Sequence, residues 1–535
     1  MPTLDWIGKK AVVNHHREVP FHLLKEVPEL SCGDPSSGNL IVEGDNLLAL
    51  KALLPYYAGR VKCIYIDPPY NTGNEGWVYN DNVNSPEMRE WLGRTVGKEA
   101  EDLSRHDKWL CMMYPRLALL KNFLREDGSI WISMDDSEIG LLRPLMDEVF
   151  GRQRFVACNV WQKRYSRENR GSIGDAHDYV LVYAMNPEKF KGTRNRVPLN
   201  EHQAKVYKNP NNDPRGRWRG IPMTAQGWRP NQMYEIKTPS GKTVTPPEGR
   251  CWSTIQPEFE KLLAENRIYF GKKGDSQPSI IRYLSEVEGL VPWTWWPHEE
   301  TGHTDEARKD VQAIFGSQTA FDTPKPVRLI ERVLQIATSP GDIVLDSFAG
   351  SGTTGHTVFR LNNSNADEEP RRFVLVEIDS KIAREVTAER CRRVSDGYTD
   401  TKGRAIPGIG GGFTYSQLSQ PVYDESGRIN ESVTFPELAR HVFFTETGSP
   451  LPSELAFETP LIGSAHGRAV YLLYNGILKD KSAQGGNRLT RKVLQDLPSF
   501  DGPKVIYGTA CQLGQELLDK HQVTFKQIPY AIPTH

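Results

Sequence analysis

The cysteines of this sequence indicate neither disulfide bonds nor a zinc site. There are seven, far apart and without a Cys-x-x-Cys pair, whereas zinc sites and small disulfide-bonded folds need closely spaced cysteines. The sequence also lacks a secretory signal and any apolar run of about 18 residues, the length that crosses a membrane. An excess of one charge is absent too, since the formal net charge is −1. We therefore expect a cytoplasmic protein with no metal and no membrane contact.

What is present suits a large globular protein with unevenly distributed charge. The chain has 535 residues, 38% of them hydrophobic and 25% charged, which is enough for a sizeable core and two or three domains. Residues 151–250 carry 19 Lys and Arg against 8 Asp and Glu. Positive charge is therefore concentrated in one segment, and the rest of the chain is acidic.

A short, stiff loop, Asp67-Pro68-Pro69-Tyr70, follows the apolar run from Cys63 to Ile66. The run predicts a buried strand, and the prolines end it because neither can donate to a sheet. The loop should lie at a strand's carboxyl end, where open α/β sheets bind ligands. The Asp67 carboxylate and the Pro68 carbonyl can accept two hydrogen bonds from one amino group, and the Tyr70 ring can stack on a base. The alternative is a proline turn in which Asp67 only caps backbone.

A glycine-rich loop follows a second predicted strand, residues 342–345; it reads Asp346-Ser347-Phe348-Ala349-Gly350-Ser351-Gly352-Thr353. The glycines allow a tight turn and a close approach to a ligand, and the helix that opens at Thr353 attracts an anionic group to its amino end. A phosphate-binding P-loop is not indicated, because no lysine follows the glycines. The loop suits a nucleotide-like cofactor.

The next predicted strand, residues 373–376, ends in Glu377. Glu377 follows Gly352 by 25 residues, close to the spacing at which an acid binds ribose hydroxyls in nucleotide-binding α/β units. We expect Glu377 to contact ribose, with Asp379 as the next candidate. The alternative is an exposed acid near a packing glycine, but Glu377 terminates a strand.

Together the two loops resemble the catalytic and cofactor motifs of amino-methyltransferases, which transfer a methyl group from S-adenosylmethionine to an exocyclic nitrogen of a nucleic-acid base. Their order, with the catalytic loop first, resembles the β class of DNA amino-methyltransferases. The segment 523–530 resembles the carboxyl terminus of modification subunits of Type III restriction-modification systems. The resemblance extends from Asp45 to Tyr530.

This resemblance implies an α/β fold: a Rossmann-like, S-adenosylmethionine-dependent methyltransferase core with circularly permuted motif order, an inserted target-recognition domain and a small carboxyl-terminal α/β module. It implies site-specific methylation of N6 of an adenine flipped out of double-stranded DNA, with Asp67, Pro68, Pro69 and Tyr70 as catalytic residues. Such subunits often form homodimers and can recruit a helicase-nuclease restriction subunit.

The resemblance also implies the cofactor contacts. The residues concerned are Asp45, Lys325, Asp346, Phe348, Gly350, Gly352, Thr353 and Glu377. Among them, Lys325 is expected at the methionine carboxylate and Asp45 near the adenine. As alternatives, Lys325 is a solvated lysine before a helix at 327–337, and Asp45 is a helix N-cap. The segment 177–179 resembles the part of this class that contacts the target base.

Residues 187–304 lose the alternation of strand and helix and are rich in Pro, Gly, Trp and Arg. Arginines interleaved with Trp218 and Trp228 suit phosphate contacts, guanine recognition and base stacking. The candidate DNA-binding residues are Arg215, Arg217, Arg219 and Arg229. In the β class, the region between the two motifs carries target recognition. A solvated basic surface is the alternative.

The predicted organisation has four parts. Residues 1–186 and 305–407 form the catalytic and cofactor halves of the core, 187–304 the target-recognition domain, and 408–535 an accessory module. Within the first half we expect a helix at 109–124 and strands at 129–134, 156–161 and 179–183. The acidic run 135–138 predicts a helix-capping turn, with Asp136 or Ser137 as the cap, and not a metal site.

Three other functions fit less well. Cytosine-N4 methylation uses the same chemistry, but that group usually has Ser in place of Asp67. An RNA methyltransferase should carry an RNA-binding module, and none is evident. A non-catalytic DNA-binding subunit could keep the fold, although the intact motifs argue against it.

Overall fold

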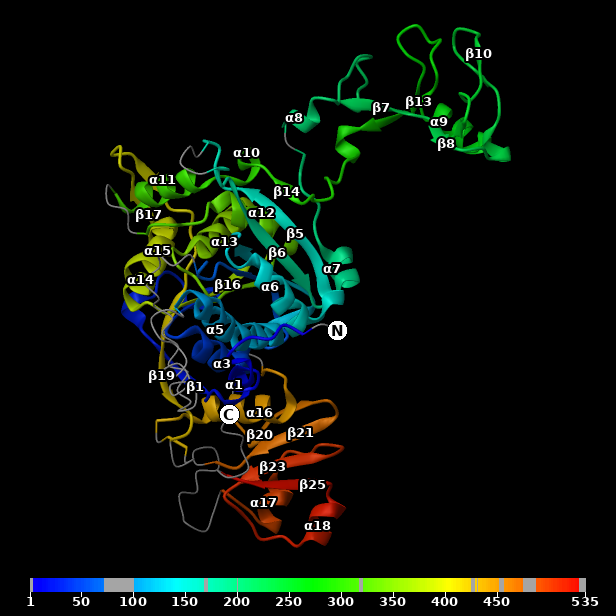
Figure 1. The fold of residues 1–535 in the computed structure, drawn as a ribbon. Helices are drawn as coiled ribbons and strands as arrows, with labels where there is room; N and C mark the ends of the chain where they lie inside the picture. Colours follow the sequence, from blue (N-terminus) through cyan, green and yellow to red (C-terminus); the bar gives the residue numbers. More distant parts are fainter. Residues whose placement is uncertain are drawn as a thin grey trace. The chain divides into compact units, whose positions relative to one another are not determined.

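The structure is a computed structural model in which residues 3–71, 101–167, 172–199, 201–316, 321–424, 429–430, 432–451, 457–474 and 487–528 are described. The chain divides into two compact units. Unit 1 comprises Met1–Asn195 and Trp293–His535, and unit 2 comprises Arg196–Pro292, so unit 2 is an insertion (Figure 1). No helix among the described residues is long and apolar enough to cross a membrane. Thr72, Gly73, Pro529 and Tyr530, which belong to predicted motifs, lie outside the described residues.

Unit 1 is built on a ten-stranded sheet with the order β1-β19-β2-β16-β15-β3-β4-β6-β5-β14. The strands are β1 His22–Glu26, β2 Leu40–Glu43, β3 Val61–Ile66, β4 Leu124–Met134, β5 Phe155–Gln162, β6 His177–Ala184, β14 Trp295–Trp296, β15 Ile343–Asp346, β16 Arg372–Glu377 and β19 Thr414–Pro421. From β19 to β4 all neighbours are parallel. Strand β6 is antiparallel to both β4 and β5.

This topology confirms the predicted Rossmann-like core and its permuted motif order. Strand β3, which leads into Asp67, is the parallel neighbour of β15, which leads into the glycine loop. All six residues of β3 are buried, as expected for a central parallel strand covered on both faces. The two loops therefore emerge side by side at one edge of the sheet, although they are far apart in the sequence.

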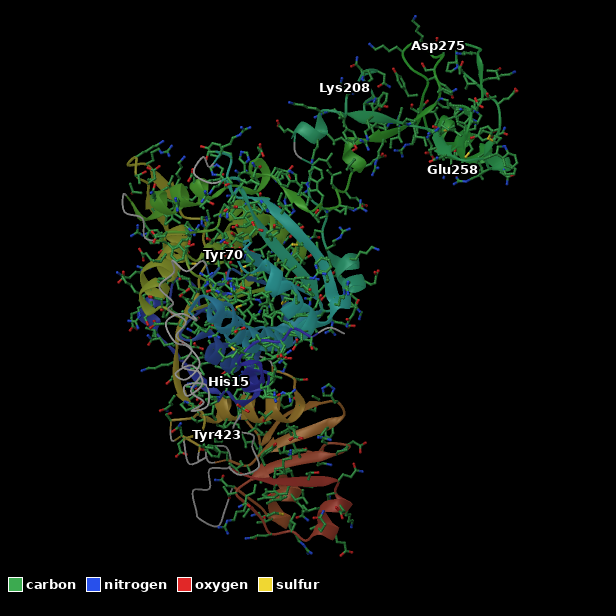
Figure 2. All side chains as sticks on the ribbon, in the orientation of Figure 1. His15, Tyr70, Lys208, Glu258, Asp275 and Tyr423 are labelled. Carbon is green, nitrogen blue, oxygen red and sulfur yellow. The ribbon has the colours of Figure 1, made fainter. Side chains whose placement is uncertain are left out.

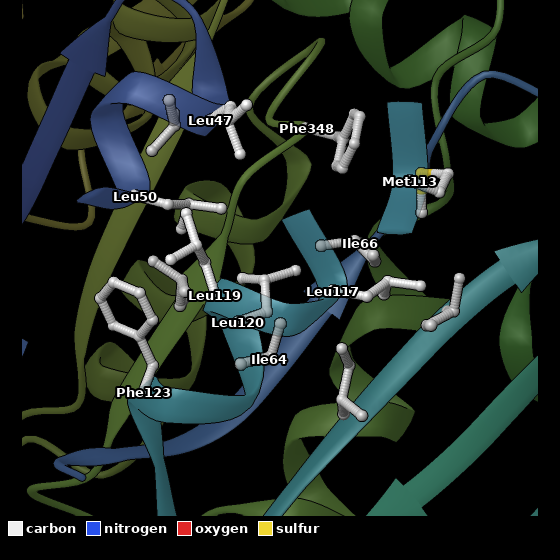
Figure 3. Packing of buried hydrophobic residues seen from close by; sticks show 14 of the residues in the cluster. Leu47, Leu50, Ile64, Ile66, Met113, Leu117, Leu119, Leu120, Phe123 and Phe348 are labelled. Atoms are coloured by element: carbon white, nitrogen blue, oxygen red, sulfur yellow. The ribbon is translucent and has the colours of Figure 1, made fainter. Parts of the chain in front are cut away.

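Helices cover both faces of the sheet. The helices of unit 1 that surround the site are α3 Asn46–Tyr57, α5 Glu101–Phe123, α6 Ile139–Met146, α12 Val327–Ala337, α13 Thr353–Ser364 and α15 Glu389–Asp396. Side chains of α3 and α5, such as Leu50 and Leu120, pack against Ile64 and Ile66 of β3 in the main core cluster (Figure 3). On the other face, Phe359 of α13 packs on Phe373 of β16 at 5.3 Å between ring centroids.

Unit 2 has its own small core. Its three-stranded sheet has the order β12-β13-β7, and two strand pairs, β10-β9 and β11-β8, accompany it. The elements are α8 Glu201–Ala204, β7 Trp218–Pro222, β8 Thr224–Gln226, β9 Ile236–Lys237, β10 Thr243–Val244, β11 Arg250–Trp252, α9 Gln256–Ala264, β12 Ile268–Tyr269 and β13 Ser279–Tyr283. Met223, Trp252, Phe259 and Phe270 are among its buried side chains.

A second sheet, with the order β20-β21-β23-β25, lies towards the carboxyl end of unit 1. Its strands are β20 Leu461–Ala465, β21 Arg468–Leu472, β23 Lys504–Gly508 and β25 Val523–Gln527, and its helices are α16 Phe435–Thr447, α17 Arg491–Asp496 and α18 Gln515–Lys520. Val442 of α16 packs on Val470 and Val505, whereas Leu518 of α18 packs in a separate cluster with Tyr471. This is the α/β arrangement that the sequence predicted.

Two local predictions were wrong. Residues 126–128 were expected to separate a helix from a strand, but β4 begins at Leu124 and continues through them as an irregularity opposite Val61 and Cys63 of β3. Neither Asp136 nor Ser137 caps α6, because its N-cap residue is Glu138, whose side chain makes no capping hydrogen bond. In the turn before it, the Asp135 carboxylate accepts a hydrogen bond from the Ser137 amide. In addition, β19 pairs with β2 in the large sheet, so this sheet extends past residue 408. The four domain boundaries stay predictions.

Candidate active site

Asp67 lies directly after β3 and is held at one of its two oxygens. Oδ2 accepts a hydrogen bond from Nζ of Lys325 at 2.6 Å. Oδ1 is buried and has no hydrogen-bond partner among the described residues. Leaving a buried carboxylate oxygen without a partner costs about 1–3 kcal/mol or more. The carboxylate is therefore oriented by the lysine and keeps one acceptor available for a ligand.

The ring of Tyr70 is fixed at its hydroxyl and on one side. The hydroxyl donates to Oδ2 of Asp178 at 3.4 Å, and Nζ of Lys325 lies 4.8 Å from the ring centroid. Burial raises the pKa of Tyr70 well above its usual value, so the phenol stays neutral. Figure 2 shows Tyr70 among the side chains of unit 1. A neutral, restrained ring is suited to stacking.

Asp178 is itself buried and paired. Its Oδ1 accepts from Nζ of Lys163 at 2.7 Å, and Lys163 also pairs with Asp175 at 2.7 Å. Burial raises the pKa of Asp178, which the two lysines Lys163 and Lys325 counteract. Asp178 thus belongs to the predicted segment 177–179 and lies beside the catalytic loop.

The far side of the catalytic loop is anchored by residues that the sequence did not indicate. The indole Nε1 of Trp109 donates to the carbonyl of Pro69 at 2.8 Å. Asn71, at φ 59°, donates through Nδ2 to Oε1 of Glu138 at 2.5 Å. The Nδ1 atom of His106 lies 2.6 Å from the same oxygen. These contacts fix the backbone on both sides of Tyr70.

Glu138 is the centre of this anchor. Its side chain is fully buried, and burial raises its pKa, which hydrogen bonds from Asn71 and His106 partly offset. The sequence analysis placed Glu138 in an acidic capping turn, because no local pattern distinguishes a buried acid from the neighbouring acids Asp135 and Asp136.

The glycine loop is organised by Asp346, the last residue of β15. Its Oδ1 accepts from the Phe348 amide at 3.0 Å and its Oδ2 from the Thr354 hydroxyl at 2.6 Å. Burial raises the pKa of Asp346 to about 7, against those two hydrogen bonds. Phe348 inserts into the core near Leu47 (Figure 3). Asp346 and Phe348, both predicted at the cofactor, hold the loop in place through these contacts.

Both glycines of the loop adopt left-handed conformations, at φ 48° for Gly350 and φ 72° for Gly352. A Cβ at Gly352 would lie 2.9 Å from the carbonyl of Thr387, and one at Gly350 would lie 3.1 Å from the Phe321 ring. Side chains at these positions would be strained and would crowd the turn. The bare backbone that the sequence predicted is therefore required.

A buried arginine, Arg390 of α15, supports the glycine loop through three hydrogen bonds. Its guanidinium donates to the carbonyl and the hydroxyl of Ser351, each at 3.1 Å, and to the hydroxyl of Thr353 at 2.8 Å. Thr353 in turn donates to the backbone carbonyl of Lys325 at 3.2 Å. Burial lowers the pKa of Arg390 to about 10. No local sequence pattern indicated this residue, which reaches the glycine loop from α15.

Glu377 lies beside the glycine loop, as its position at the end of β16 predicted. Its Oε2 accepts from the Gly350 amide at 2.7 Å and its Oε1 from the Asp379 amide at 3.0 Å. Burial raises its pKa, against these backbone hydrogen bonds. Asp379 instead caps α14 (Ser380–Ile382) through the amides of Lys381 and Ile382. A carboxylate oxygen accepts more than one hydrogen bond, so Glu377 keeps capacity for a hydroxyl.

The structure gives Asp45 and Lys325 specific partners. Asp45 caps α3 by accepting from the amides of Leu47 and Leu48, and it pairs with Arg116 at 3.3 Å. Lys325 pairs with Asp67. The predicted contacts of Asp45 with adenine and of Lys325 with the cofactor carboxylate stay predictions.

The four predicted arginines of unit 2 differ in their surroundings. Arg215 pairs with Asp213 at 3.0 Å, and Arg217 donates to the carbonyls of Tyr207 and Ala204. Arg219 lies 5.2 Å from the Tyr207 ring. Arg229 is exposed and donates to Gln232 at 3.2 Å. Arg215 and Arg217 therefore have structural contacts within unit 2.

These residues fit the cofactor that the resemblance implies. A Cβ at Gly350 or Gly352 would crowd Phe321 or Thr387, so the loop keeps a bare backbone that a ligand can approach closely. The buried acid Glu377 adjoins this backbone, and nucleotide-binding α/β folds use an acid near such a loop to bind the ribose hydroxyls. Among the described residues, no group of three or more His, Cys, Asp or Glu side chains could hold a metal ion.

The sequence of the chain is similar to those of known proteins. A family model described as "DNA methylase" matches residues 61–389. The StyLTI Mod subunit of a Type III restriction-modification enzyme from Salmonella typhimurium is 34% identical over 403 residues, covering 72% of this chain and 60% of the relative. The EcoP15I Mod subunit of Escherichia coli is 30% identical, covering 74% of this chain and 66% of the relative.

A third relative is covered more fully. The EcoPI Mod subunit of Escherichia phage P1 is 30% identical over 504 residues, covering 83% of this chain and 74% of its own. The chain thus spans less than two thirds of the first two relatives and about three quarters of the third. Among solved structures, the cytosine-N4-specific PvuII DNA methyltransferase aligns at a TM-score of 0.33 and 14% identity, covering 66% of this chain and 86% of its own.

Proposed function

Because this chain belongs to the DNA methylase family, we propose that it transfers a methyl group from S-adenosylmethionine to N6 of a specific adenine in double-stranded DNA. One observation carries the proposal. Asp67, with a buried oxygen that lacks a partner among the described residues, follows the strand adjacent to the one that leads into the glycine loop. An acceptor for an amino group and a cradle for a cofactor therefore lie at one edge of one sheet.

Lys325 links the two loops. Its ammonium binds Asp67, and its backbone carbonyl accepts from Thr353 at the end of the glycine loop. A shift of either loop is thereby transmitted to the other. Such coupling matters because in-line transfer between two bound molecules depends on close alignment of the reacting atoms.

S-adenosylmethionine supplies an electrophilic methyl group when bound. The residues that would hold it are the backbone of Gly350 and Gly352 and the carboxylate of Glu377, with Asp45 and Lys325 as further candidates. The support for this placement is the positive φ of both glycines and the burial of Glu377 beside them.

The catalytic loop acts on the base. The Oδ1 atom of Asp67 and the carbonyl of Pro68 accept hydrogen bonds from the two N–H bonds of the adenine amino group, which favours a tetrahedral nitrogen with an available lone pair. The Tyr70 ring stacks on the flipped base. Pro69, Asn71, Trp109 and Glu138 hold the loop in this geometry through the contacts described above.

Site recognition is assigned to the inserted part of the chain. Residues 187–304 form the target-recognition domain, of which unit 2, Arg196–Pro292, is the compact part. Residues 1–186 and 305–407 supply the catalytic and cofactor halves, and 408–535 an accessory module. The local excess of positive charge supports DNA binding there.

The chain also acts with partners. Its relatives are named as subunits of Type III restriction-modification enzymes. We expect the chain to form a homodimer and to bind a helicase-nuclease restriction subunit, with methylation protecting the host sites. Sedimentation of the purified chain, alone and with the candidate partner, tests both expectations.

The proposal is tested by mapping modified bases in DNA from a methylation-free host that expresses this chain. We expect N6-methyladenine at one short sequence, and none in a host expressing the Asp67→Ala variant. N4-methylcytosine at a site would replace the adenine assignment. Unmodified DNA despite cofactor binding by the purified chain would support a non-catalytic subunit.

A further inference from the structure

Two arginines of unit 2 face each other across a pair of strands. Arg219 of β7 and Arg282 of β13 are direct partners in the antiparallel register. Directly opposed residues leave the same face of a sheet, with Cβ atoms about 4.5–5.5 Å apart, and like charges in this position destabilise the pair. The strand pair therefore holds two positive charges together at a cost.

These arginines share one face of the sheet with Ile280, which packs against the core of unit 2, but the arginines themselves lie beyond that covered part. The opposite face is buried, because Trp218, Ile281 and Tyr283 pack together. Arg219 is exposed and Arg282 partly exposed. The guanidinium of Arg219 lies 5.2 Å from the ring of Tyr207, a distance at which a cation is attracted to an aromatic face. Both arginines are thus at least partly exposed, and the Tyr207 ring supports the guanidinium of Arg219 from one side. Figure 2 labels Lys208, which forms a bridge to Trp218 beside β7.

Arg219 and Arg282 differ from the other six arginines of unit 2. Each of those six has a side-chain hydrogen bond or ion pair: Arg196 with Glu288, Arg215 with Asp213, Arg217 with the carbonyls of Ala204 and Tyr207, Arg229 with Gln232, Arg250 with Thr224, and Arg267 with Glu286. Within the described residues, neither Arg219 nor Arg282 has an acidic partner or a guanidinium hydrogen bond. Their charges are not compensated by the protein.

We propose that Arg219 and Arg282 together bind one phosphate group of the DNA backbone, an inference that rests on the DNA methylation proposed above. A phosphate offers several acceptor oxygens to two planar donor groups and removes the repulsion between them. A backbone phosphate fits better than a base edge, because a single guanine edge is filled by one bidentate arginine. Arg282 could not be chosen from the sequence, since it lies outside the basic segment and meets Arg219 only through strand pairing.

The test compares Arg219→Thr, Arg282→Thr and the double variant with the parent chain. Threonine suits a strand and removes the charge. The control is Arg196→Thr, which removes one positive charge from the same unit but from an arginine that has an acidic partner. Affinity is measured on a duplex that carries the mapped methylation site and on one without it, over a range of salt concentrations, with melting temperature measured in parallel.

We expect each single variant to bind both duplexes about tenfold more weakly. Because one phosphate is shared, the double variant should lose clearly less than the product of the single effects. The slope of log affinity against log salt should fall by about one unit. Melting temperatures should stay unchanged or rise, since the repulsion is relieved, and the control should stay within about twofold of the parent.

Three results would overturn this inference. Unchanged affinity and salt slope in the variants would show that the two arginines do not contact DNA. A loss of affinity confined to one base pair of the site would assign them to a base edge. Independent, multiplicative effects of the two substitutions would mean two separate contacts. If the parent itself neither binds nor methylates DNA, the proposed function fails and the phosphate site with it. If the parent methylates DNA but the variants bind DNA with unchanged affinity and salt slope, only the phosphate site is excluded.

Discussion

At the scale of single residues, we propose that neighbouring residues of the catalytic loop have separate roles as acceptor, stacking ring and anchor. Asp67 has one oxygen on Lys325 and the other without a partner among the described residues. Tyr70 is restrained at its hydroxyl by Asp178, and Asn71 is tied to a buried acid. These contacts restrain the three side chains, so the loop is organised before any ligand binds.

Asp67→Ala should abolish most methyl transfer. The loss of a charged acceptor in the transition state lowers kcat on the order of 10²-fold or more, whereas the affinity for S-adenosylmethionine should stay within a few-fold because Asp67 contacts the base. Single-turnover kinetics and calorimetry measure the two quantities. Near-parental turnover would contradict the role given to Asp67.

Glu138→Leu should lower kcat while cofactor affinity is retained. Without Glu138, Asn71 loses its hydrogen bond to that side chain and the loop can shift, and a displacement of about 1 Å can cost about 10²-fold in rate. Glu138→Gln keeps an acceptor for Asn71 and should restore most activity. The rates are measured with saturating DNA and cofactor.

The matched control for Glu138 is Asp342→Leu. Asp342 is also a buried carboxylate with an ion pair, to Arg125 at 2.8 Å, but it lies at the amino end of β15, away from the site. This variant should lower the melting temperature without changing kcat. Equal kcat in the Leu and Gln variants of Glu138 would show that Glu138 only supports the fold.

At the scale of elements, the site is made by strand ends and the turns that follow them. Strand β15 with its glycine loop and α13 forms one element, and β16 supplies the acid beside it. Three side chains form hydrogen bonds with the loop and hold it: Asp346 from its own strand, Glu377 from the next strand and Arg390 from α15. Its conformation is therefore fixed by polar contacts as much as by its glycines.

Glu377→Ala should weaken the binding of S-adenosylmethionine by about 1.5–3 kcal/mol, the contribution of a hydrogen bond to a charged group. The DNA sequence that is methylated should not change, since Glu377 does not belong to unit 2, to which we assign site recognition. Isothermal titration measures the affinity. Asp379→Ala, which removes only a helix cap, serves as the control and should bind normally; the reverse pattern would assign the ribose to Asp379.

Asp346 should make folding stability depend on pH. Its pKa in the folded chain is raised to about 7 by burial, above the value of about 3.9 for an unfolded aspartate. The folded state therefore favours the protonated form, and the contribution of Asp346 to stability falls as pH rises from about 4 to about 7, by up to about 4 kcal/mol. Asp346→Asn should reduce this fall. Urea unfolding at a series of pH values tests it, and identical pH profiles for parent and variant would exclude the effect.

At the scale of the whole molecule, the proposed function assigns recognition and chemistry to different parts of the chain. The catalytic and cofactor loops belong to unit 1, and the basic insertion forms unit 2. Helix α7 (Pro187–Thr193) lies beside β4 and β6 in unit 1, so an exchange of recognition regions should spare it. The compact unit 196–292 is the natural segment to replace.

Exchanging residues 196–292 for those of a relative should redirect methylation to the relative's sequence while adenine stays the modified base. The physical reason is that base contacts specify a site, whereas the transfer residues act on the amino group alone. Base-resolution mapping of host DNA reads out the change. A chimera that methylates the original site would move recognition to the carboxyl-terminal module or to a partner.

The sequence by itself determined the strands around the site and the residues that follow them. Apolar runs such as 63–66 and 373–376 favour burial, and prolines or glycines make the chain turn where a strand ends. The positions of Asp67, Gly350 and Glu377 at or after the ends of buried strands could therefore be predicted locally. Helix 327–337 was predicted at its observed bounds for the same reason, since its apolar periodicity is strong.

Only the tertiary structure decided which side chains complete the site. Lys325 pairs with an aspartate from the other half of the core, Glu138 turns inward from a run of acids, and Arg282 is brought opposite Arg219 by strand pairing. None of these pairs has a fixed spacing in the sequence, because each depends on the order of strands in a sheet and on the depth of burial. Local patterns specify where the chain turns and what it buries, but the partner of a buried charge is set by the packing of distant segments.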